Sequence, residues 1–167
     1  MQSAEHNALY NKPVPFAIRD YQSSDFDTLW RLDQSCFPAG IAYSRNELRH
    51  YIRRPAAFTL VAQEGTESAS GIAGFLVAEV ERGSGHVITI DVIAAARRSG
   101  VGSLLLSTAE ERLRAAKCGR VELETAVDNV SALSFYKRHG YSVVRTFPRY
   151  YSNGVDALIL EKELKKK

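Results

Sequence analysis

Short runs of apolar residues recur along this chain and predict seven strands. The runs 58–63 and 71–80 flank a polar loop, a pattern typical of a β-hairpin. The run 86–93 is almost continuously apolar, which predicts a strand buried on both faces of a sheet. The full set of predicted strands is 16–19, 58–63, 71–80, 86–93, 121–127, 141–147 and 155–164.

A different spacing predicts helices between these strands. From Gly100 to Gly119, apolar residues recur every three or four positions and would form one face of a helix. On its polar side, Glu110 and Arg114 are spaced for an exposed i,i+4 ion pair. The other predicted helices are 25–37, 45–54 and 128–140. Helices that alternate with strands, without repeats or low-complexity linkers, predict a single α/β domain in which helices cover a sheet.

Composition narrows the class of protein. Of the 167 residues, 45% are hydrophobic and 25% charged, the balance of an ordinary globular domain. The net charge is only +3 and no basic patch is interleaved with aromatic residues, so we expect no nucleic-acid partner. No apolar run approaches the roughly 20 residues of a membrane helix. Residues 1–15 lack the apolar core of a signal peptide, so we expect a cytoplasmic protein that does not enter a membrane.

Cysteine and histidine spacing points to neither a redox motif nor a metal site. Cys36 and Cys118 are far apart, which fits a reducing compartment. The four histidines show no ligand spacing, so we expect no metal. We expect residues 1–15 to form a tail, 16–164 the domain and 165–167 a basic tail.

The stretch "ARRSGVGSLLL" at 96–106 combines two arginines, two glycines and the start of a helix. A helix N-terminus carries unpaired N–H groups and a partial positive charge, and glycines let such a backbone close around an anion. This design suits a phosphate group. The alternative is a tight turn with two solvated arginines. The stretch lacks both the GxxxxGK[ST] loop of nucleotide-binding proteins and the third glycine of the dinucleotide motif.

The pattern Arg97-x-x-Gly100-x-Gly102 resembles the acetyl-CoA pyrophosphate loop of the GNAT superfamily of N-acetyltransferases. From about Phe16 to Leu164 the chain is similar to the RimI-type protein N-terminal acetyltransferases. The matching stretches are "FAIRDYQSSDFDTLWRLDQSCFP", "ITIDVIAAARRSGVGSLLL", "LETAVDNVSALSFYKRHGY" and "PRYYSNGVDALIL". The chain departs from the family at 94–96, where three alanines replace a proline and an aromatic residue, and at Thr125, where the family has valine.

The resemblance implies a GNAT-type α/β domain with a mixed, mostly antiparallel sheet whose fourth and fifth strands splay apart. Acetyl-CoA would be the co-substrate, and its pantetheine arm would lie in the gap. A strand N–H there would stabilise the developing oxyanion. The residues implied to contact acetyl-CoA are Ile90, Asp91, Val92, Arg97, Arg98, Ser99, Gly100, Val101, Gly102, Ser103 and Asn129. For the Asp91 side chain a catalytic role is possible; the alternative is a carboxylate at a strand edge facing solvent or an arginine. Asn129 could simply cap a helix.

Two catalytic residues follow from the resemblance. Glu124 matches the general base, although Glu122 lies on the same strand face and periodicity cannot separate them. A glutamate pKa near 4.3 is far below that of an amine, so the base would act through water or with a raised pKa. Tyr136 matches the general acid. The alternatives are a solvated strand residue for Glu124 and a core aromatic for Tyr136.

The acceptor is implied to be the α-amino group of a protein or peptide. Tyr150 and Tyr151 could form a wall of its binding site, or simply an aromatic pair at a strand end. An α-amine loses its proton more readily than lysine, by about 2.4 pKa units. Two alternatives stay open: an acetyltransferase for a small amine, and a non-catalytic acyl-CoA sensor. The residues do not specify the oligomeric state.

Overall fold

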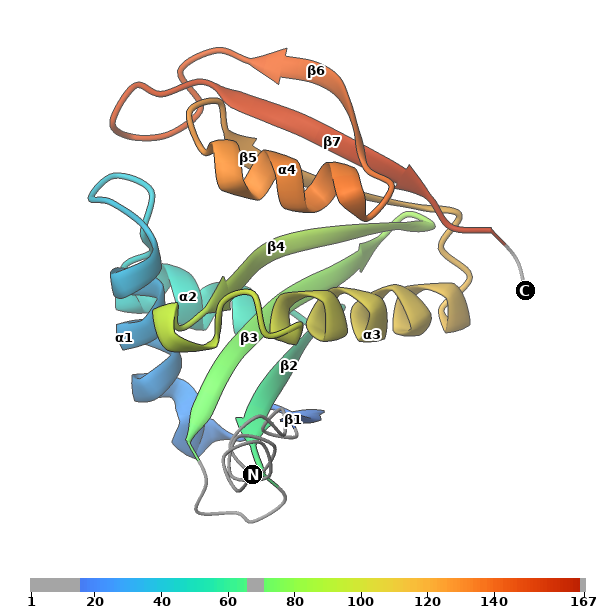
Figure 1. Ribbon diagram of the computed structural model, residues 1–167. Coiled ribbons are helices and arrows are strands. Elements are labelled where there is room, and N and C mark those ends of the chain that lie inside the picture. The colour runs from blue at the N-terminus through green and yellow to red at the C-terminus, as the bar shows by residue number, and fades with distance from the viewer. Residues whose placement is uncertain (1–15, 66–70, 166–167) are drawn as a thin grey trace, which may run out of the picture.

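The computed structural model describes residues 16–65 and 71–165 (Figure 1). The predicted tail 1–15 and the last two residues of the predicted basic tail lie outside the described residues. The elements are β1 (Phe16–Asp20), η1 (Ser23–Asp25), α1 (Phe26–Cys36), α2 (Arg45–Ile52), β2 (Ala57–Glu64), β3 (Ile72–Glu81), β4 (Ser84–Val92), η2 (Ala94–Ala96), α3 (Val101–Ala115), β5 (Arg120–Ala126), α4 (Val130–Arg138), β6 (Ser142–Phe147) and β7 (Ala157–Glu163).

All seven predicted strands form one sheet, in the order β1-β2-β3-β4-β5-β7-β6. Every neighbouring pair is antiparallel except β4 and β5, which are parallel and joined through α3. The predicted mixed, mostly antiparallel sheet is therefore confirmed. Within the described part of the chain, no helix combines the length and apolar character needed to cross a lipid bilayer.

Helices cover both faces of the sheet (Figure 1). One core packs α3 against the β2–β4 part of the sheet, with Leu105 and Leu106 of α3 fully buried. A second core lies on the opposite face, where Leu29 of α1 and Leu48 of α2 are fully buried beside Phe75. Helix α4 lies over β5 and β7 (Figure 1). The sheet therefore carries two cores, and both reach β4.

Strands β4 and β5 separate as predicted. Their pairing runs only from Gly85 opposite Val121 to Val87 opposite Leu123. The next residue, Ile88, has no counterpart in β3, because Val77 pairs with Thr89 while Ala78 pairs with Val87. An extra residue of this kind is a β-bulge, which bends its strand and increases the local twist. The bulge thus turns β4 away from β5 at the point where their pairing ends.

This separation also corrects the prediction that β4 is buried on both faces. Helices do cover both faces, but Ile88, Ile90 and Val92 remain only half-buried. They are partly accessible because β4 has no neighbour on its β5 side beyond Val87.

The predicted surface pair of Glu110 and Arg114 is wrong. Glu110 is 4% exposed, and both of its carboxylate oxygens accept hydrogen bonds of 2.8 Å from Lys162 of β7. Arg114 instead pairs with Glu111, at 3.0 Å. Helical spacing identified the polar side of α3, but β7 covers part of that side and supplies a cation there. The pair ties α3 to the half of the sheet that follows it.

Removing this tie should destabilise the fold. Lys162→Met leaves the buried carboxylate of Glu110 without its cation, and we expect a loss of about 2–3 kcal/mol in the free energy of unfolding. Arg114→Met breaks an exposed pair of the same helix and should cost less than about 1 kcal/mol. Urea unfolding of both variants measures the difference. Equal losses would mean that the Glu110–Lys162 pair contributes no more than a surface pair.

Candidate active site

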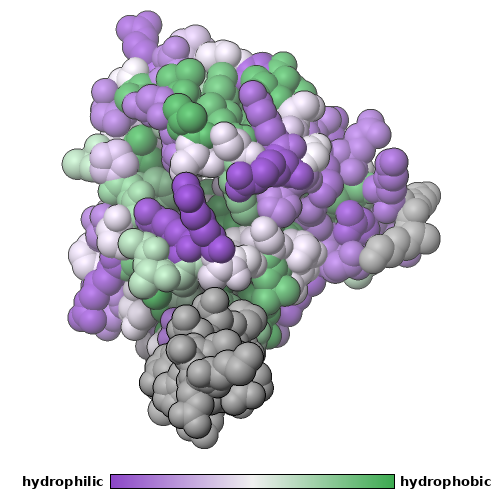
Figure 2. All heavy atoms as spheres, in the orientation of Figure 1, coloured by the Kyte–Doolittle hydropathy of each residue, from purple (hydrophilic) through white to green (hydrophobic). Residues whose placement is uncertain are grey.

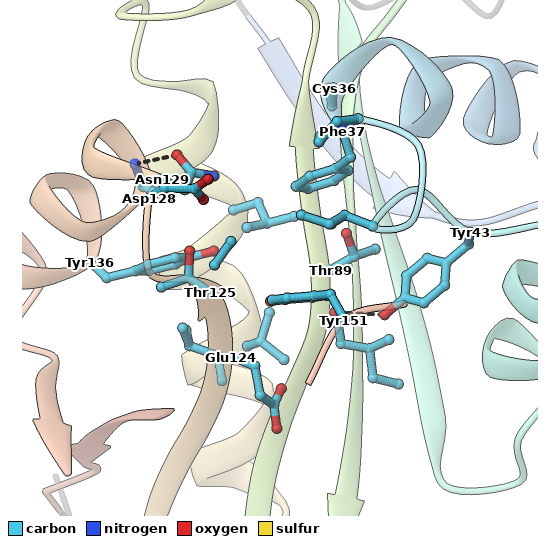
Figure 3. A pocket seen from close by; sticks show the side chains of 18 of the residues that line it. Cys36, Phe37, Tyr43, Thr89, Glu124, Thr125, Asp128, Asn129, Tyr136 and Tyr151 are labelled. Atoms are coloured by element: carbon cyan, nitrogen blue, oxygen red, sulfur yellow. Dashed lines mark hydrogen bonds between the residues drawn. The ribbon is translucent and has the colours of Figure 1, made fainter. Parts of the chain in front are cut away.

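A cavity of about 390 Å³ opens where β4 and β5 diverge. Figure 2 shows the face that contains this region, with hydrophobic residues in a hollow and hydrophilic residues around it. The cavity, called the cleft below, is lined by Cys36, Phe37, Pro38, Ile41, Tyr43, Val87, Ile88, Thr89, Ile90, Leu123, Glu124, Thr125, Ala126, Asp128, Asn129, Ala132, Tyr136, Tyr151 and Asn153. Five of these come from the end of α1 and the segment after it, so segments far apart in sequence build one site (Figure 3).

Of the two candidate glutamates on β5, Glu124 is the one that lines the cleft. Its Oε2 lies 2.7 Å from Nε2 of His86 on the neighbouring strand. Glu122 instead accepts a hydrogen bond of 3.1 Å from Arg145 and lines only a second cavity, which Glu124 and His86 also line. Geometry therefore separates two residues that strand periodicity could not.

His86 is a candidate functional residue that the sequence did not reveal. Its other ring nitrogen, Nδ1, lies 3.6 Å from Oε1 of Glu79, and that oxygen accepts a hydrogen bond of 2.8 Å from Arg54. Burial alone would lower the pKa of His86, but the carboxylates of Glu124 and Glu79 outweigh it and raise the pKa. The imidazole can therefore carry a proton near neutral pH while bonded to Glu124.

Tyr136 both packs in the core and lines the cleft. It projects from α4 into the cleft (Figure 3) and is 7% exposed. Its ring lies edge-on to Tyr141, with centroids 5.8 Å apart. Burial raises the pKa of the Tyr136 hydroxyl, and the negative charge of Asp91 adds to the increase. The hydroxyl is therefore protonated at neutral pH, and it holds its proton more tightly than an ordinary tyrosine does.

Asn129 caps α4. Its side-chain oxygen accepts a hydrogen bond of 3.2 Å from the backbone N–H of Ala132 (Figure 3). The residue also lines the cleft, and the cap leaves the NH₂ group of the amide as a donor. Capping and ligand binding are therefore compatible in this residue.

The glycine-rich loop leads into α3. Gly100 is the N-cap residue of α3 with φ of 90°, and an added Cβ would meet no atom within 4 Å, so the backbone here is open. At Gly102 an added Cβ would lie 3.3 Å from the ring of Phe135, so this glycine allows α3 and α4 to pack closely. Arg98 also has a positive φ, of 64°. The loop thus presents the free N–H groups of a helix N-terminus, and residues 97–103 lie outside the lining of the cleft.

The loop side chains differ in where they point. Arg97 turns back toward β4, where its Nε donates to the carbonyl of Val92 at 3.2 Å and its guanidinium lies 3.7 Å from the Cys36 sulfur. Ser99 donates to the carbonyl of Ala96. Ser103 is hydrogen-bonded to His139 at 2.9 Å. An anion at this loop could therefore bind the backbone N–H groups of α3 directly. The guanidinium of Arg97 would have to turn outward to reach it.

Ile90, Asp91 and Val92 lie on the part of β4 that β5 leaves unpaired, and Ile90 is the one of the three that lines the cleft. The side chain of Asp91 corrects one alternative given above. It does not face solvent, because it is 1% exposed, and its hydrogen bond of 2.6 Å comes from Thr89; Arg97 lies near enough to add positive charge but forms no ion pair with it in the described part of the chain. Its burial keeps this carboxyl group away from the cleft.

The tyrosine pair lies in the loop between β6 and β7. Tyr151 lines the cleft, as does Tyr43 (Figure 3). Tyr150 is 45% exposed and packs edge-on against Tyr151, with centroids 5.0 Å apart. A hydrogen bond of 2.8 Å from Ser152 to the carbonyl of Gly40 joins this loop to the segment after α1. The two segments therefore meet beside the cleft, and Tyr151 contributes to its wall.

Comparison with known proteins identifies the family. Residues 26–141 match the acetyltransferase (GNAT) family. The chain belongs to this family. It is 30% identical over 147 residues to an uncharacterized N-acetyltransferase of Methanocaldococcus jannaschii, covering 87% of this chain and 90% of that protein. It is 25% identical over 162 residues to an N-alpha-acetyltransferase of Sulfurisphaera tokodaii, covering 89% of this chain and 93% of that protein.

The GNAT fold is also that of solved structures. The crystal structure of the ribosomal-protein-S18-alanine N-acetyltransferase from Escherichia coli superposes with a TM-score of 0.78 at 18% identity, over 92% of this chain and 96% of that one. At that identity the likeness concerns the fold. Together with the family match, it confirms the predicted GNAT domain, and the protein is an acetyl-CoA-dependent N-acetyltransferase.

The glycine-rich loop provides a test of acetyl-CoA binding. Gly100→Asp places a carboxylate at the N-terminus of α3, where it would occupy the space of a phosphate group and repel that group's negative charge. Gly100→Asn has nearly the same shape and the same backbone strain without the charge. We expect the aspartate variant to bind acetyl-CoA about tenfold more weakly than the asparagine variant, as measured by calorimetry. Equal affinities in folded variants would argue against phosphate binding at this loop.

Proposed function

We propose that this N-acetyltransferase transfers the acetyl group of acetyl-CoA to the α-amino group of a protein or peptide. The observation that carries the proposal is the position of Glu124, which is hydrogen-bonded to His86, in a cleft that Tyr43 and Tyr151 also line. Amphipathic rings with hydroxyl groups suit a peptide backbone, which offers both apolar surface and hydrogen-bond partners. The N-alpha-acetyltransferase of Sulfurisphaera tokodaii, which matches nearly the whole chain, supports the same acceptor class.

The charges in the cleft favour a peptide over a polyamine. Among the lining residues, the carboxylates are those of Glu124 and Asp128. Glu124 is already paired with His86, so little negative charge is left to attract a molecule with several ammonium groups. A single α-amine attached to a largely neutral backbone fits this environment better.

The residues present fit acetyl-CoA. The unpaired stretch of β4 at Ile90, Asp91 and Val92 can pair with the amide groups of a pantetheine arm, as a strand would. The open backbone at Gly100 and the first turn of α3 can hold phosphate groups. Arg98 adds positive charge there, and Asn129 can donate from the opposite side of the cleft. Acetyl-CoA supplies an activated acetyl group and a thiol leaving group.

Three side chains carry out the proton transfers of the proposed reaction. The acceptor must lose a proton as its nitrogen bonds the acetyl carbon and the carbon–sulfur bond breaks. Glu124, bonded to His86, takes that proton directly or through a water molecule. His86 lines the second cavity together with Glu124, so it can pass the proton on there. Tyr136, which is protonated at neutral pH, donates the proton that the leaving sulfur needs.

A comparison of the two glutamates on β5 tests the base. Glu124→Gln removes the proton acceptor, and we expect turnover at neutral pH to fall by about 100-fold while acetyl-CoA affinity is nearly unchanged. Glu122→Gln makes the same chemical change two residues earlier and should alter turnover by less than about twofold. Steady-state kinetics and calorimetry measure both variants. A loss of less than about threefold in Glu124→Gln would move the role of base to His86 or to water.

A peptide that carries both an α-amine and a lysine tests the acceptor class. At neutral pH the α-amine has the larger neutral fraction, by about 2.4 pKa units. We expect fragmentation by mass spectrometry to place the acetyl group on the first residue. A peptide with a blocked N-terminus is the control and should show little CoA release. Acetylation chiefly on lysine, or a small amine that outperforms every peptide, would overturn the proposed acceptor and leave the acetyltransferase activity intact.

A further inference from the structure

Two carboxyl groups are buried together behind the cleft. Asp33 of α1 is 0% exposed and Asp91 of β4 is 1% exposed. Each lies within hydrogen-bonding reach of the other. Neither belongs to an ion pair in the described part of the chain. Two negative charges in such a place would be very costly, because a buried charge needs a partner.

The hydrogen-bond donors to the four carboxyl oxygens of Asp33 and Asp91 leave two of these oxygens without a partner among the described residues. Asp33 Oδ2 accepts the backbone N–H of Tyr43 at 2.7 Å, and Asp91 Oδ1 accepts the hydroxyl of Thr89 at 2.6 Å. The remaining oxygens, Asp33 Oδ1 and Asp91 Oδ2, are buried and receive no donor from the described residues. Two carboxylate oxygens can only repel each other. A proton on one of them turns the repulsion into a short, charge-assisted hydrogen bond.

The surrounding charges do not remove the need for a proton between Asp33 and Asp91. From α2, Glu47 adds negative charge near Asp33, and from the loop after η2, Arg97 adds positive charge near Asp91. The guanidinium of Arg97 is already turned toward Val92 and Cys36, and it is exposed. The nearby Cys36, Tyr43 and Tyr136 are neutral, because burial raises the pKa of each. Burial likewise raises the pKa of Asp33, and raises that of Asp91 strongly.

We propose that Asp33 and Asp91 share one proton, and that the resulting carboxyl–carboxylate hydrogen bond positions the segment 37–44 as a wall of the acceptor cleft. The first part stands on the burial of both carboxyl groups and on their two oxygens that lack a donor among the described residues. The second rests on the proposed function, in which the cleft receives the peptide. Neither carboxyl group touches the reacting atoms, so both are positioning residues.

The link from the pair to the wall runs through Tyr43. Its backbone N–H is held by Asp33, and its carbonyl accepts hydrogen bonds from Trp30 at 3.2 Å and Gln34 at 2.7 Å. Its hydroxyl donates to the carbonyl of Ile88, the bulge residue, at 3.4 Å. The segment is thus fastened to α1 and β4 at a residue that also lines the cleft. Losing the shared proton would push Asp33 away from Asp91 and loosen that fastening.

The shared proton has a thermodynamic signature. At neutral pH the unfolded chain would have both aspartates ionised, whereas the folded chain would hold one extra proton. Stability from this pair is therefore complete below the ordinary carboxyl pKa of about 4 and is lost as pH rises toward the raised pKa of the pair. In that window the folding equilibrium constant falls by about tenfold per pH unit from this source.

Asp33→Asn tests the proton directly. The amide can accept the N–H of Tyr43 with its oxygen and donate to Asp91 with its NH₂ group, so it replaces the shared proton with a fixed one. We expect urea unfolding at a series of pH values to show a slope smaller by about one proton than in wild type. Asp27→Asn changes an exposed carboxylate of the same helix and should keep the wild-type slope. Equal slopes in wild type and Asp33→Asn would overturn the proposal.

Infrared spectroscopy and kinetics complete the test. Wild type at neutral pH should show the C=O band of a protonated carboxyl group, and Asp33→Asn should lack it; absence of the band from wild type would overturn the shared proton.

Asp33→Ala should raise KM for peptide by about tenfold and KM for acetyl-CoA by less than twofold, whereas Asp33→Asn stays near wild type at pH 7. If Asp33→Ala does not fold, the slope and the infrared band still decide the first part. A normal peptide KM in folded Asp33→Ala would overturn the positioning role. Neither the slope nor the band depends on catalysis, so they stand apart from a failure of the proposed acceptor class.

Discussion

The short pairing between β4 and β5 is the constraint on which the rest of the structure depends. Its last pair joins Val87 to Leu123, and the bulge at Ile88 follows at once. Had the pairing continued, the backbone of β4 would be satisfied by β5 and no cleft would exist. Because it stops there, the two halves of the sheet stay joined at one end only. The Glu110–Lys162 pair adds a second tie, between α3 and β7.

The carboxyl groups around the cleft are kept in different states by what surrounds them. Glu124 lies in the cleft next to a histidine that can take or return a proton. Asp33 and Asp91 lie behind the wall, where a hydroxyl and a backbone N–H are the donors within the described residues. The first arrangement suits proton movement during a reaction, whereas the second suits holding a proton in place. The difference in burial and in hydrogen-bond partners thus separates a chemical role from a positioning one.

The sequence predicted the helices, the strands and the start of α3 near Gly100, because each depends on local spacing. It missed features set by distant partners. His86 meets Glu124 only through the register of a parallel pair, 38 positions apart. Asp91 meets Asp33 through the packing of α1 on β4, and Glu110 meets a lysine from the last strand. The bulge at Ile88 lies within an apolar run, where one extra residue leaves no compositional signal.

The open edge of β4 also bears on how this protein behaves at high concentration. Exposed strand edges are the usual templates on which chains add to one another and aggregate. Here the edge lies inside the molecule, between residues such as Phe37 and Pro38 on one side and Asn129 and Ala132 on the other. A short, recessed edge of this kind admits a slender extended molecule more readily than the flat strand of another protein. The fold therefore keeps a reactive strand edge without offering it to neighbouring copies.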